Sequence, residues 1–195
     1  LICRLYDTTN GDIKIGEANI KNINLFNLRS SIGYIPQDGY LFSGSIKDNI
    51  AFTSNSINEK KIAECIEQAK ISKEIQEFKD GTETIIGERG VKLSGGQRQR
   101  ITLARTLYKD PKIFILDDCL SAIDAVKEKQ ILKNLKLNNK NRTSIVISHR
   151  ISTLKDAHNI IVLDKGKILE KGTHKELMKL KGLYYTTNNM QRKSM

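Results

Sequence analysis

Two adjacent carboxylates, Asp117 and Asp118, directly follow the apolar run of residues 113–116. A short apolar run of this kind is typical of a buried strand. A buried strand that delivers an aspartate at its carboxyl end suits an Mg²⁺ ion bound to phosphates. Many apolar strands end in an aspartate without any function, so this feature alone leaves both interpretations open.

A small turn with two glycines lies upstream of these carboxylates, at residues 93–97 with the sequence LSGGQ. Apolar residues then recur at helical spacing from Ile101 to Tyr108. This spacing predicts a helix over residues 98–108, which Pro111 ends. A turn that opens a helix presents free backbone N–H groups at the positive helix end, where a phosphate binds well. A Gly-Gly turn alone is often only a turn, but two phosphate-directed features so close together predict nucleotide chemistry.

These two features carry a resemblance to a known family. Residues 92–124 resemble the nucleotide-binding domain of ABC transporters, whose signature motif is LSGGQ and whose Walker B strand is similar to residues 113–117. The resemblance implies ATP and Mg²⁺ as cofactors. It also implies an α/β fold, with a P-loop NTPase-like parallel sheet core and an inserted α-helical subdomain (the ABC ATPase fold). In that family the signature turn completes the ATP site of a second chain; the residues concerned are Ser94, Gly95, Gly96 and Gln97.

The resemblance gives the two carboxylates different roles. Asp117 would hold Mg²⁺, and the position of Asp118 is that of the general base or water-positioning group, which is glutamate in most of the family. Aspartate is one methylene shorter, so its carboxylate lies about 1.5 Å back from the attacking water. A misplacement of this size can cost on the order of 100-fold in rate. In the family this substitution is typical of the poorly hydrolysing half of a heterodimeric exporter, in which the D-loop of residues 121–124, with Asp124, communicates between the two sites.

Two further polar residues follow predicted strands. Gln37 comes after a strand predicted at residues 32–35, and its amide oxygen can bind Mg²⁺ or a water. His149 comes after a strand predicted at residues 143–147, so we expect it at the same sheet edge as Asp117. A glutamine or a lone histidine in such a place is often only structural. By resemblance they are the Q-loop glutamine, which senses the γ-phosphate, and the switch histidine, which hydrogen-bonds it.

Two stretches resemble the exporter subgroup of the family. They are LFSGSIKDNI at residues 41–50 and GERG at residues 87–90. Glu88 and Arg89 would otherwise be read as solvated charges. By resemblance they form the X-loop, which contacts the intracellular loops of the transmembrane domains.

The remaining sequence predicts the elements of one domain. Residues 1–44 are expected to hold core and Q-loop, residues 45–92 the helical subdomain, and residues 93–182 the signature, Walker B, D-loop and switch-histidine regions. At the two ends we expect a helix tail at residues 1–7 and a polar, frayed tail at residues 183–195. The Walker A P-loop, G-x-x-x-x-G-K-[ST], does not occur in the 195 residues, so we expect the N-terminal part of the fold to be missing from this chain.

Composition narrows the class of protein further. With 38% hydrophobic and 28% charged residues the chain is an ordinary globular one, without an apolar run of the roughly 20 residues that span a bilayer. The net charge of +11 comes from scattered lysines without interleaved aromatic residues, so we expect no nucleic-acid partner. The three scattered cysteines lack metal-ligand spacing, which favours reduced thiols.

The sequence thus predicts an ATP-binding and ATP-hydrolysing domain of an ABC exporter at the cytoplasmic face of the cell membrane. The expected partners are the coupling helices of transmembrane domains and a second nucleotide-binding domain, in a homodimer or, as Asp118 favours, a heterodimer. The chain alone is expected to be inactive. Two alternatives stay open: a non-enzymatic interaction module without ATP binding, and a soluble ABC ATPase that acts on nucleic acid, which only the charge favours.

Overall fold

The computed structural model describes residues 1–52, 54, 56–87, 90–137 and 142–193. Glu88 and Arg89, the predicted X-loop pair, lie outside the described residues. The chain divides into two compact units, Leu1–Ile145 and Val146–Met195, and each is described by itself.

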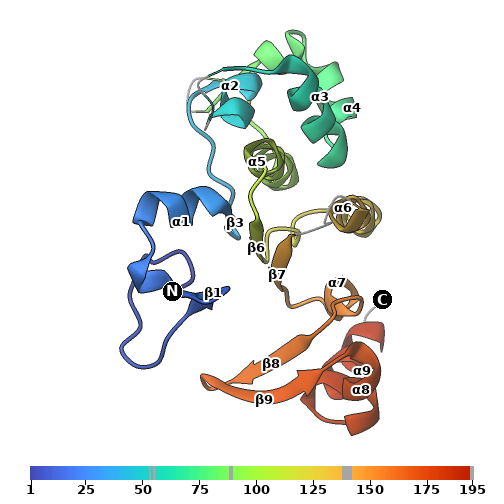
Figure 1. The fold of residues 1–195 in the computed structure, drawn as a ribbon. Coiled ribbons are helices and arrows are strands. Elements are labelled where there is room, and N and C mark those ends of the chain that lie inside the picture. Colours follow the sequence, from blue (N-terminus) through green and yellow to red (C-terminus); the bar gives the residue numbers. More distant parts are fainter. Residues whose placement is uncertain (53, 55, 88–89, 138–141, 194–195) are drawn as a thin grey trace. The chain divides into compact units, whose positions relative to one another are not determined.

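The first unit is built on a parallel pair of strands. β3 (Ile32–Ile35) and β6 (Ile113–Asp117) run parallel, in a register that pairs Ile35 with Leu116. β7 (Thr143–Ile147), which crosses the boundary between the units, is the third strand of this sheet, in the order β3-β6-β7 (Figure 1). The predicted parallel-sheet core and its three strands are therefore confirmed.

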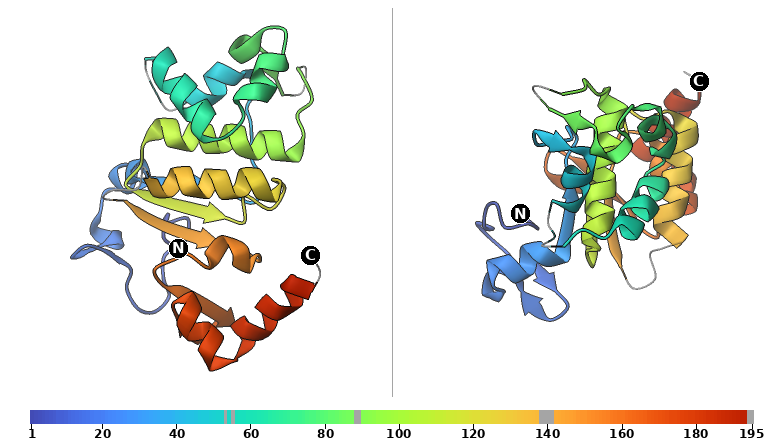
Figure 2. Two further views of the ribbon diagram at one scale, coloured as in Figure 1. Left: turned by 90° about the vertical axis from the view of Figure 1, so that its right-hand side faces the viewer. Right: turned by 90° about the horizontal axis from the view of Figure 1, so that it is seen from above.

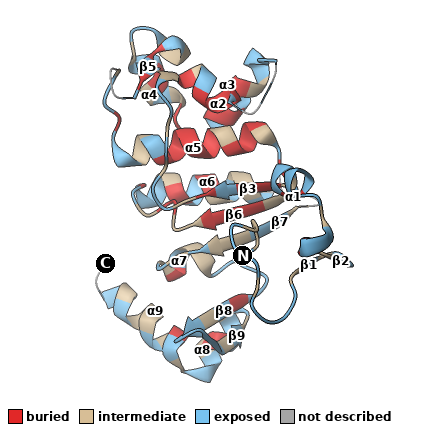
Figure 3. Ribbon diagram, turned by 90° about the vertical axis from the view of Figure 1, so that its left-hand side faces the viewer, coloured by how far each residue is buried: buried red, intermediate tan, exposed pale blue. Residues whose placement is uncertain are grey.

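α5 (Gly95–Lys109) packs tightly on this sheet. A Cβ atom at Gly33 of β3 would come within 2.5 Å of the Thr106 side chain and 2.6 Å of Pro111, so only glycine allows this approach. Nine residues of α5 are buried, and Figure 3 shows buried residues gathered along α5 and on β6. The helix that carries the signature turn is thereby held against β3, the strand that pairs with the strand carrying Asp117.

The described part of residues 45–92 contains small helices. These are α2 (Ile46–Ala51), α3 (Glu59–Gln68), α4 (Ser72–Glu77) and the 3-10 turn η2 (Gly81–Glu83), and a short antiparallel pairing of β4 (Gly44–Ser45) with β5 (Ile85–Ile86) accompanies them. α2 and α3 pack on α5 (Figure 2). α6 (Ala125–Leu137) follows the D-loop. The helices expected within residues 45–92 are therefore present.

The start of the chain differs from the expectation. β1 (Lys14–Ile15), β2 (Ala18–Asn19), the 3-10 turn η1 (Ile20–Asn22) and α1 (Leu25–Ser31) are formed. The helix tail expected at residues 1–7 is wrong, because these residues form turns and bends and Arg4 has a φ of 47°. The carbonyls of Cys3 and Arg4 accept hydrogen bonds from the Arg29 guanidinium instead of from helical N–H groups.

The second unit consists of a strand pair and three helices. β8 (Ile160–Asp164) and β9 (Lys167–Gly172) are antiparallel, and α7 (Ile151–Leu154), α8 (His174–Leu180) and α9 (Leu183–Lys193) accompany them. The frayed tail expected from residue 183 is wrong. Tyr184 of α9 is buried with Ile151, Ile160 and Leu177, and its hydroxyl lies 2.9 Å from His174 Nδ1. Burial of one aromatic ring thus orders a segment whose composition is polar.

Within the described part of the chain, none of the helices has the length and apolar character needed to cross a membrane.

Candidate functional site

Parallel pairing of β3 and β6 brings Gln37 and Asp117 to one edge of the sheet. Since Ile35 pairs with Leu116, both residues lie at the carboxyl ends of neighbouring strands. The Tyr34 hydroxyl donates a hydrogen bond of 3.0 Å to Asp117 Oδ2. Burial and this hydrogen bond raise the pKa of Tyr34, so the hydroxyl remains a donor at neutral pH. Tyr34 therefore orients the half-buried Asp117 carboxylate, a role that the sequence analysis missed because the two residues are 83 positions apart.

The backbone changes direction at Asp118, directly after the end of β6. Its φ of 45° lies in the left-handed region, which aspartate tolerates better than most residues. Its carbonyl accepts hydrogen bonds from the Ser121 hydroxyl at 2.8 Å and from the Ser121 N–H at 3.3 Å. The two adjacent aspartates therefore have different backbone conformations. Asp117 is the last residue of the strand, and Asp118 begins the turn into the D-loop.

The donor set at this edge fits Mg²⁺. The side chains are the carboxylate of Asp117 and the amide oxygen of Gln37, and both are hard oxygen ligands. Among the described residues no group of three or more His, Cys, Asp or Glu could hold a metal ion. This pattern suits Mg²⁺, which proteins commonly bind through one or two side chains together with substrate phosphates.

The segment after β3 is fastened to α5. Gln99 Nε2 donates a hydrogen bond of 3.0 Å to the carbonyl of Gln37. A Cβ atom at Gly39 would lie 2.8 Å from the Thr102 hydroxyl, so this segment lies directly against the helix. The other amide atom of Gln99, Oε1, is buried and has no hydrogen-bond partner within the described residues. Any movement of Gln37 is therefore coupled to the helix that carries the signature turn.

Ser94 and Gln97 cap α5 in a reciprocal way. Ser94 is the N-cap residue; its hydroxyl accepts from the Gln97 N–H at 3.2 Å, and Gln97 Oε1 accepts from the Ser94 N–H at 2.8 Å. This capping box leaves Gly95 and Gly96 as the first helical residues, whose N–H groups have no acceptor within the helix. Part of the signature therefore serves the helix itself. The S-x-x-Q spacing is a known sequence signal for such a cap, and the sequence analysis did not use it.

The D-loop lies against the signature turn. A Cβ atom at Gly96 would lie 2.8 Å from the carbonyl oxygen of Ala122, whereas one at Gly95 would lie 3.8 Å from the Ala122 side chain. Ile123 is buried, and Asp124 Oδ1 accepts from the Lys127 N–H at 3.0 Å at the start of α6. That hydrogen bond lowers the pKa of Asp124. The signature turn and the D-loop thus lie in contact within the first unit.

His149 belongs to the second unit, where it is exposed. Its carbonyl accepts a hydrogen bond of 2.6 Å from Gln191 Nε2, and Gln191 Oε1 accepts from the Ile151 N–H at 3.0 Å. Gln191 of α9 therefore clamps the backbone on both sides of residue 150. The predicted closeness of His149 to Asp117 stays a prediction.

An exposed aromatic cluster of Tyr40, Phe42 and Phe52, at the two ends of the exporter-like stretch 41–50, lies around Arg105 of α5. The rings of Phe42 and Phe52 stack with centroids 4.1 Å apart, and Tyr40 meets Phe42 edge-on at 5.1 Å. Arg105 donates to the carbonyls of Tyr40 and Asn49 and lies 5.3 Å from the Phe42 ring centroid. Next to Tyr40 lies a cavity of about 340 Å³, which Leu41, Val91 and Leu93 help to line. Exposed rings held by the partly buried Arg105 make a firm apolar surface.

Comparison with known proteins places these features in one family. A family model described as ABC transporter matches residues 1–121. The ABC transporter ATP-binding protein YwjA of Bacillus subtilis, which is uncharacterised, is 42% identical over 191 residues, which are 98% of this chain and 33% of that protein. An ATP-dependent lipid A-core flippase of Desulfotalea psychrophila is 43% identical over 98% of this chain and 33% of its own length.

The solved structures agree. A bacterial Atm1-family ABC exporter with ATP bound superposes with a TM-score of 0.92 at 37% identity, over 97% of this chain and 33% of that one. This likeness confirms the predicted fold class. The chain spans about a third of the length of these relatives.

Proposed function

The chain belongs to the ABC transporter family, and from this premise we propose that it is part of an ATPase domain that drives export across a membrane. The observation that carries the proposal is the presence of two phosphate-directed surfaces on one unit. One is the sheet edge with Gln37, Asp117 and Asp118, and the other is the signature turn at the start of α5. The domain would act at the cytoplasmic face of the cell membrane.

At the sheet edge, Asp117 and Gln37 would hold Mg²⁺. The ion, when bound with ATP, supplies positive charge that neutralises the phosphates during phosphoryl transfer. Tyr34 keeps the Asp117 carboxylate oriented by its hydrogen bond to Oδ2. Asp118 orients the attacking water and accepts its proton, with a carboxylate about 1.5 Å shorter in reach than that of glutamate. His149 would donate a hydrogen bond to the γ-phosphate.

The signature turn would serve a second nucleotide-binding domain. The Ser94 hydroxyl can still donate its proton, because in the capping box it acts only as an acceptor. Together with the N–H groups of Gly95 and Gly96 it would bind the γ-phosphate of ATP held by the partner. An intact signature beside a shortened base supports a heterodimer in which this chain completes the competent site and its own site hydrolyses weakly.

The aromatic cluster of Tyr40, Phe42 and Phe52 is the surface that we assign to the coupling helices of the transmembrane domains. It directly follows Gln37 in the chain, and Gln99 of α5 bonds the Gln37 carbonyl while Arg105 of the same helix bonds the cluster. A displacement of these rings by a coupling helix would therefore be transmitted to the sheet edge through α5.

The test is the ATPase activity of the intact protein with its partner. Ser94→Ala is expected to lower turnover by about 100-fold or more, since it removes a donor aimed at developing charge. Asp118→Asn is expected to lower it by less than about threefold, because the weak site contributes little turnover. If Asp118→Asn abolishes turnover as completely as Ser94→Ala does, the asymmetry is refuted. Thermal unfolding of both variants controls for loss of the cap at Ser94.

A further inference from the structure

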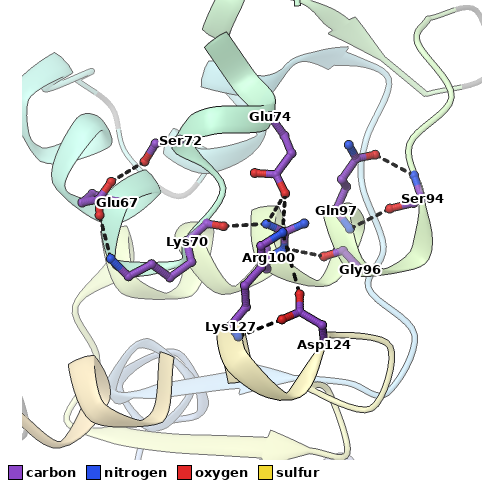
Figure 4. A network of polar contacts seen from close by, with 10 residues as sticks. All are labelled: Glu67, Lys70, Ser72, Glu74, Ser94, Gly96, Gln97, Arg100, Asp124 and Lys127. Atoms are coloured by element: carbon purple, nitrogen blue, oxygen red, sulfur yellow. Dashed lines mark hydrogen bonds and ion pairs between the residues drawn. The ribbon is translucent and has the colours of Figure 1, made fainter. Parts of the chain in front are cut away.

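Glu74 of α4 is the centre of an ion network between three helices. Its Oε1 accepts a hydrogen bond of 2.7 Å from Arg100 of α5 and one of 2.9 Å from Lys127 of α6 (Figure 4). The side chain of Glu74 is 18% exposed and that of Arg100 only 6%. One carboxylate oxygen thus holds two cations from helices that follow the signature turn and the D-loop.

Both cations of the network make further polar contacts. Arg100 also donates to the carbonyls of Lys70 and Gly96, and Lys127 lies 3.7 Å from Asp124 Oδ2. Burial raises the pKa of Glu74, but the hydrogen bonds from Lys127 and Arg100 outweigh it and bring that pKa below its ordinary value. The carboxylate is therefore charged at neutral pH, and its loss would leave a buried guanidinium without its counter-charge.

Both ends of the network reach loops of the candidate site. Arg100 Nε donates to the carbonyl of Gly96 at 3.2 Å, which belongs to the signature turn. Lys127 reaches Asp124 through both its side chain and its backbone N–H, and Asp124 closes the D-loop. Between these points Gly96 and Ala122 are in direct backbone contact. The contacts form a closed circuit of signature turn, Arg100, Glu74, Lys127 and D-loop.

We propose that Glu74 is a positioning residue that locks the D-loop to the signature turn, so that the two loops present one rigid surface. Given the proposed function, that surface is the one that meets the partner's nucleotide. An exposed ion pair of this kind would have little effect. Here the guanidinium is buried and the oxygen is shared, so the network resists separation of α4, α5 and α6.

The experiment is amide hydrogen exchange of the full chain with Glu74→Gln. In the wild type the N–H groups of Ile123, Lys127 and Glu128 bond within the D-loop and its helix start, and those of Gln97 and Arg98 bond to Ser94. The variant is expected to exchange at these amides about tenfold faster, the change that follows from about 1.4 kcal/mol of lost local stability. Amides of β3 and β6 should be unchanged.

Glu67→Gln is the matched control. Glu67 also bonds a lysine and a serine of the same region, Lys70 and Ser72, but it touches neither loop. It should leave exchange at both loops as in the wild type. Lys127→Met is a second test variant, since it cuts the circuit at the D-loop side. It should accelerate amide exchange in the D-loop. In the double variant its effect on exchange should not add to that of Glu74→Gln, because each substitution already removes the contact between Glu74 and Lys127.

Unchanged exchange at the two loops in Glu74→Gln overturns the inference. So does an equal acceleration across β3, β6 and the loops, which would show a purely structural role. The proposed function has a separate readout: MgATP-dependent association of the intact wild type with a partner domain. If association is absent while Glu74→Gln accelerates exchange at the two loops as expected, the proposed function is refuted and the positioning role of Glu74 is supported. If both hold, Glu74→Gln should weaken association about tenfold, with the KM for ATP changed less than kcat.

Discussion

The two glycines of the signature turn differ in the space that a Cβ atom would find. Gly95 and Gly96 have no side chain and adjoin each other in the first turn of α5. Only Gly96 has a backbone oxygen, that of Ala122, inside the space that a Cβ would need. The two glycines of LSGGQ therefore differ in their surroundings: a Cβ would fit at Gly95, whereas close backbone packing excludes one at Gly96.

Gly96→Ala is expected to destabilise the first unit by about 1–3 kcal/mol, because the new Cβ would force the D-loop away from α5. Gly95→Ala is the matched control. Its Cβ would meet the Ala122 side chain at an ordinary 3.8 Å, so the free energy of unfolding should stay the same or rise slightly. Denaturant unfolding of the two variants gives the comparison. Equal stability in both would contradict the close contact at Gly96.

At the scale of elements, helices position site residues that they do not contain. α5 holds the Gln37 carbonyl through Gln99 and the aromatic cluster through Arg105. α9, which the sequence analysis took for a frayed tail, clamps the backbone around His149 through Gln191. In both cases an amide or guanidinium on a rigid helix fixes the carbonyl of a loop.

Gln191→Ala should loosen the segment that carries His149. Loss of two hydrogen bonds is expected to cost about 1–2 kcal/mol of local stability, because each contributes about 1 kcal/mol net. Amide exchange at Ile151, whose N–H bonds Gln191, measures this directly. Thr186→Ala is the control on the same helix, since its hydroxyl bonds only the Gly182 carbonyl at the helix start. The idea is refuted if Ile151 is protected equally in the two variants.

At the scale of the whole molecule, the proposed function gives the 195 residues surfaces for two different nucleotides. The sheet edge would bind a nucleotide of its own domain, and the signature turn would bind that of the partner. No G-x-x-x-x-G-K-[ST] motif occurs in the sequence, so the backbone cradle and lysine that bind the phosphates most strongly are not part of these residues.

Calorimetric titration of the 195-residue chain with MgATP should therefore show a Kd weaker than about 1 mM. A longer chain, extended by a segment that carries G-x-x-x-x-G-K-[ST], should bind at least about 100-fold more tightly. Ser94→Ala in the longer chain is the control, because Ser94 is assigned to the partner's nucleotide and should leave this affinity unchanged. Micromolar binding by the 195 residues alone would contradict the division into two half-sites.

Sequence alone determined what depends on local pattern and residue type. The apolar run before Asp117, the LSGGQ turn and the strand before Gln37 define their own structure within a few residues, and their closeness predicted nucleotide chemistry. The parallel-sheet core was implied by the resemblance that these motifs carry. Only the tertiary structure decided the contacts between distant segments. Tyr34 orients Asp117, and Glu74 joins Arg100 to Lys127, because packing brings side chains together that no periodicity relates. The burial of Tyr184 likewise ordered a polar segment, since one buried ring outweighs a weak local preference.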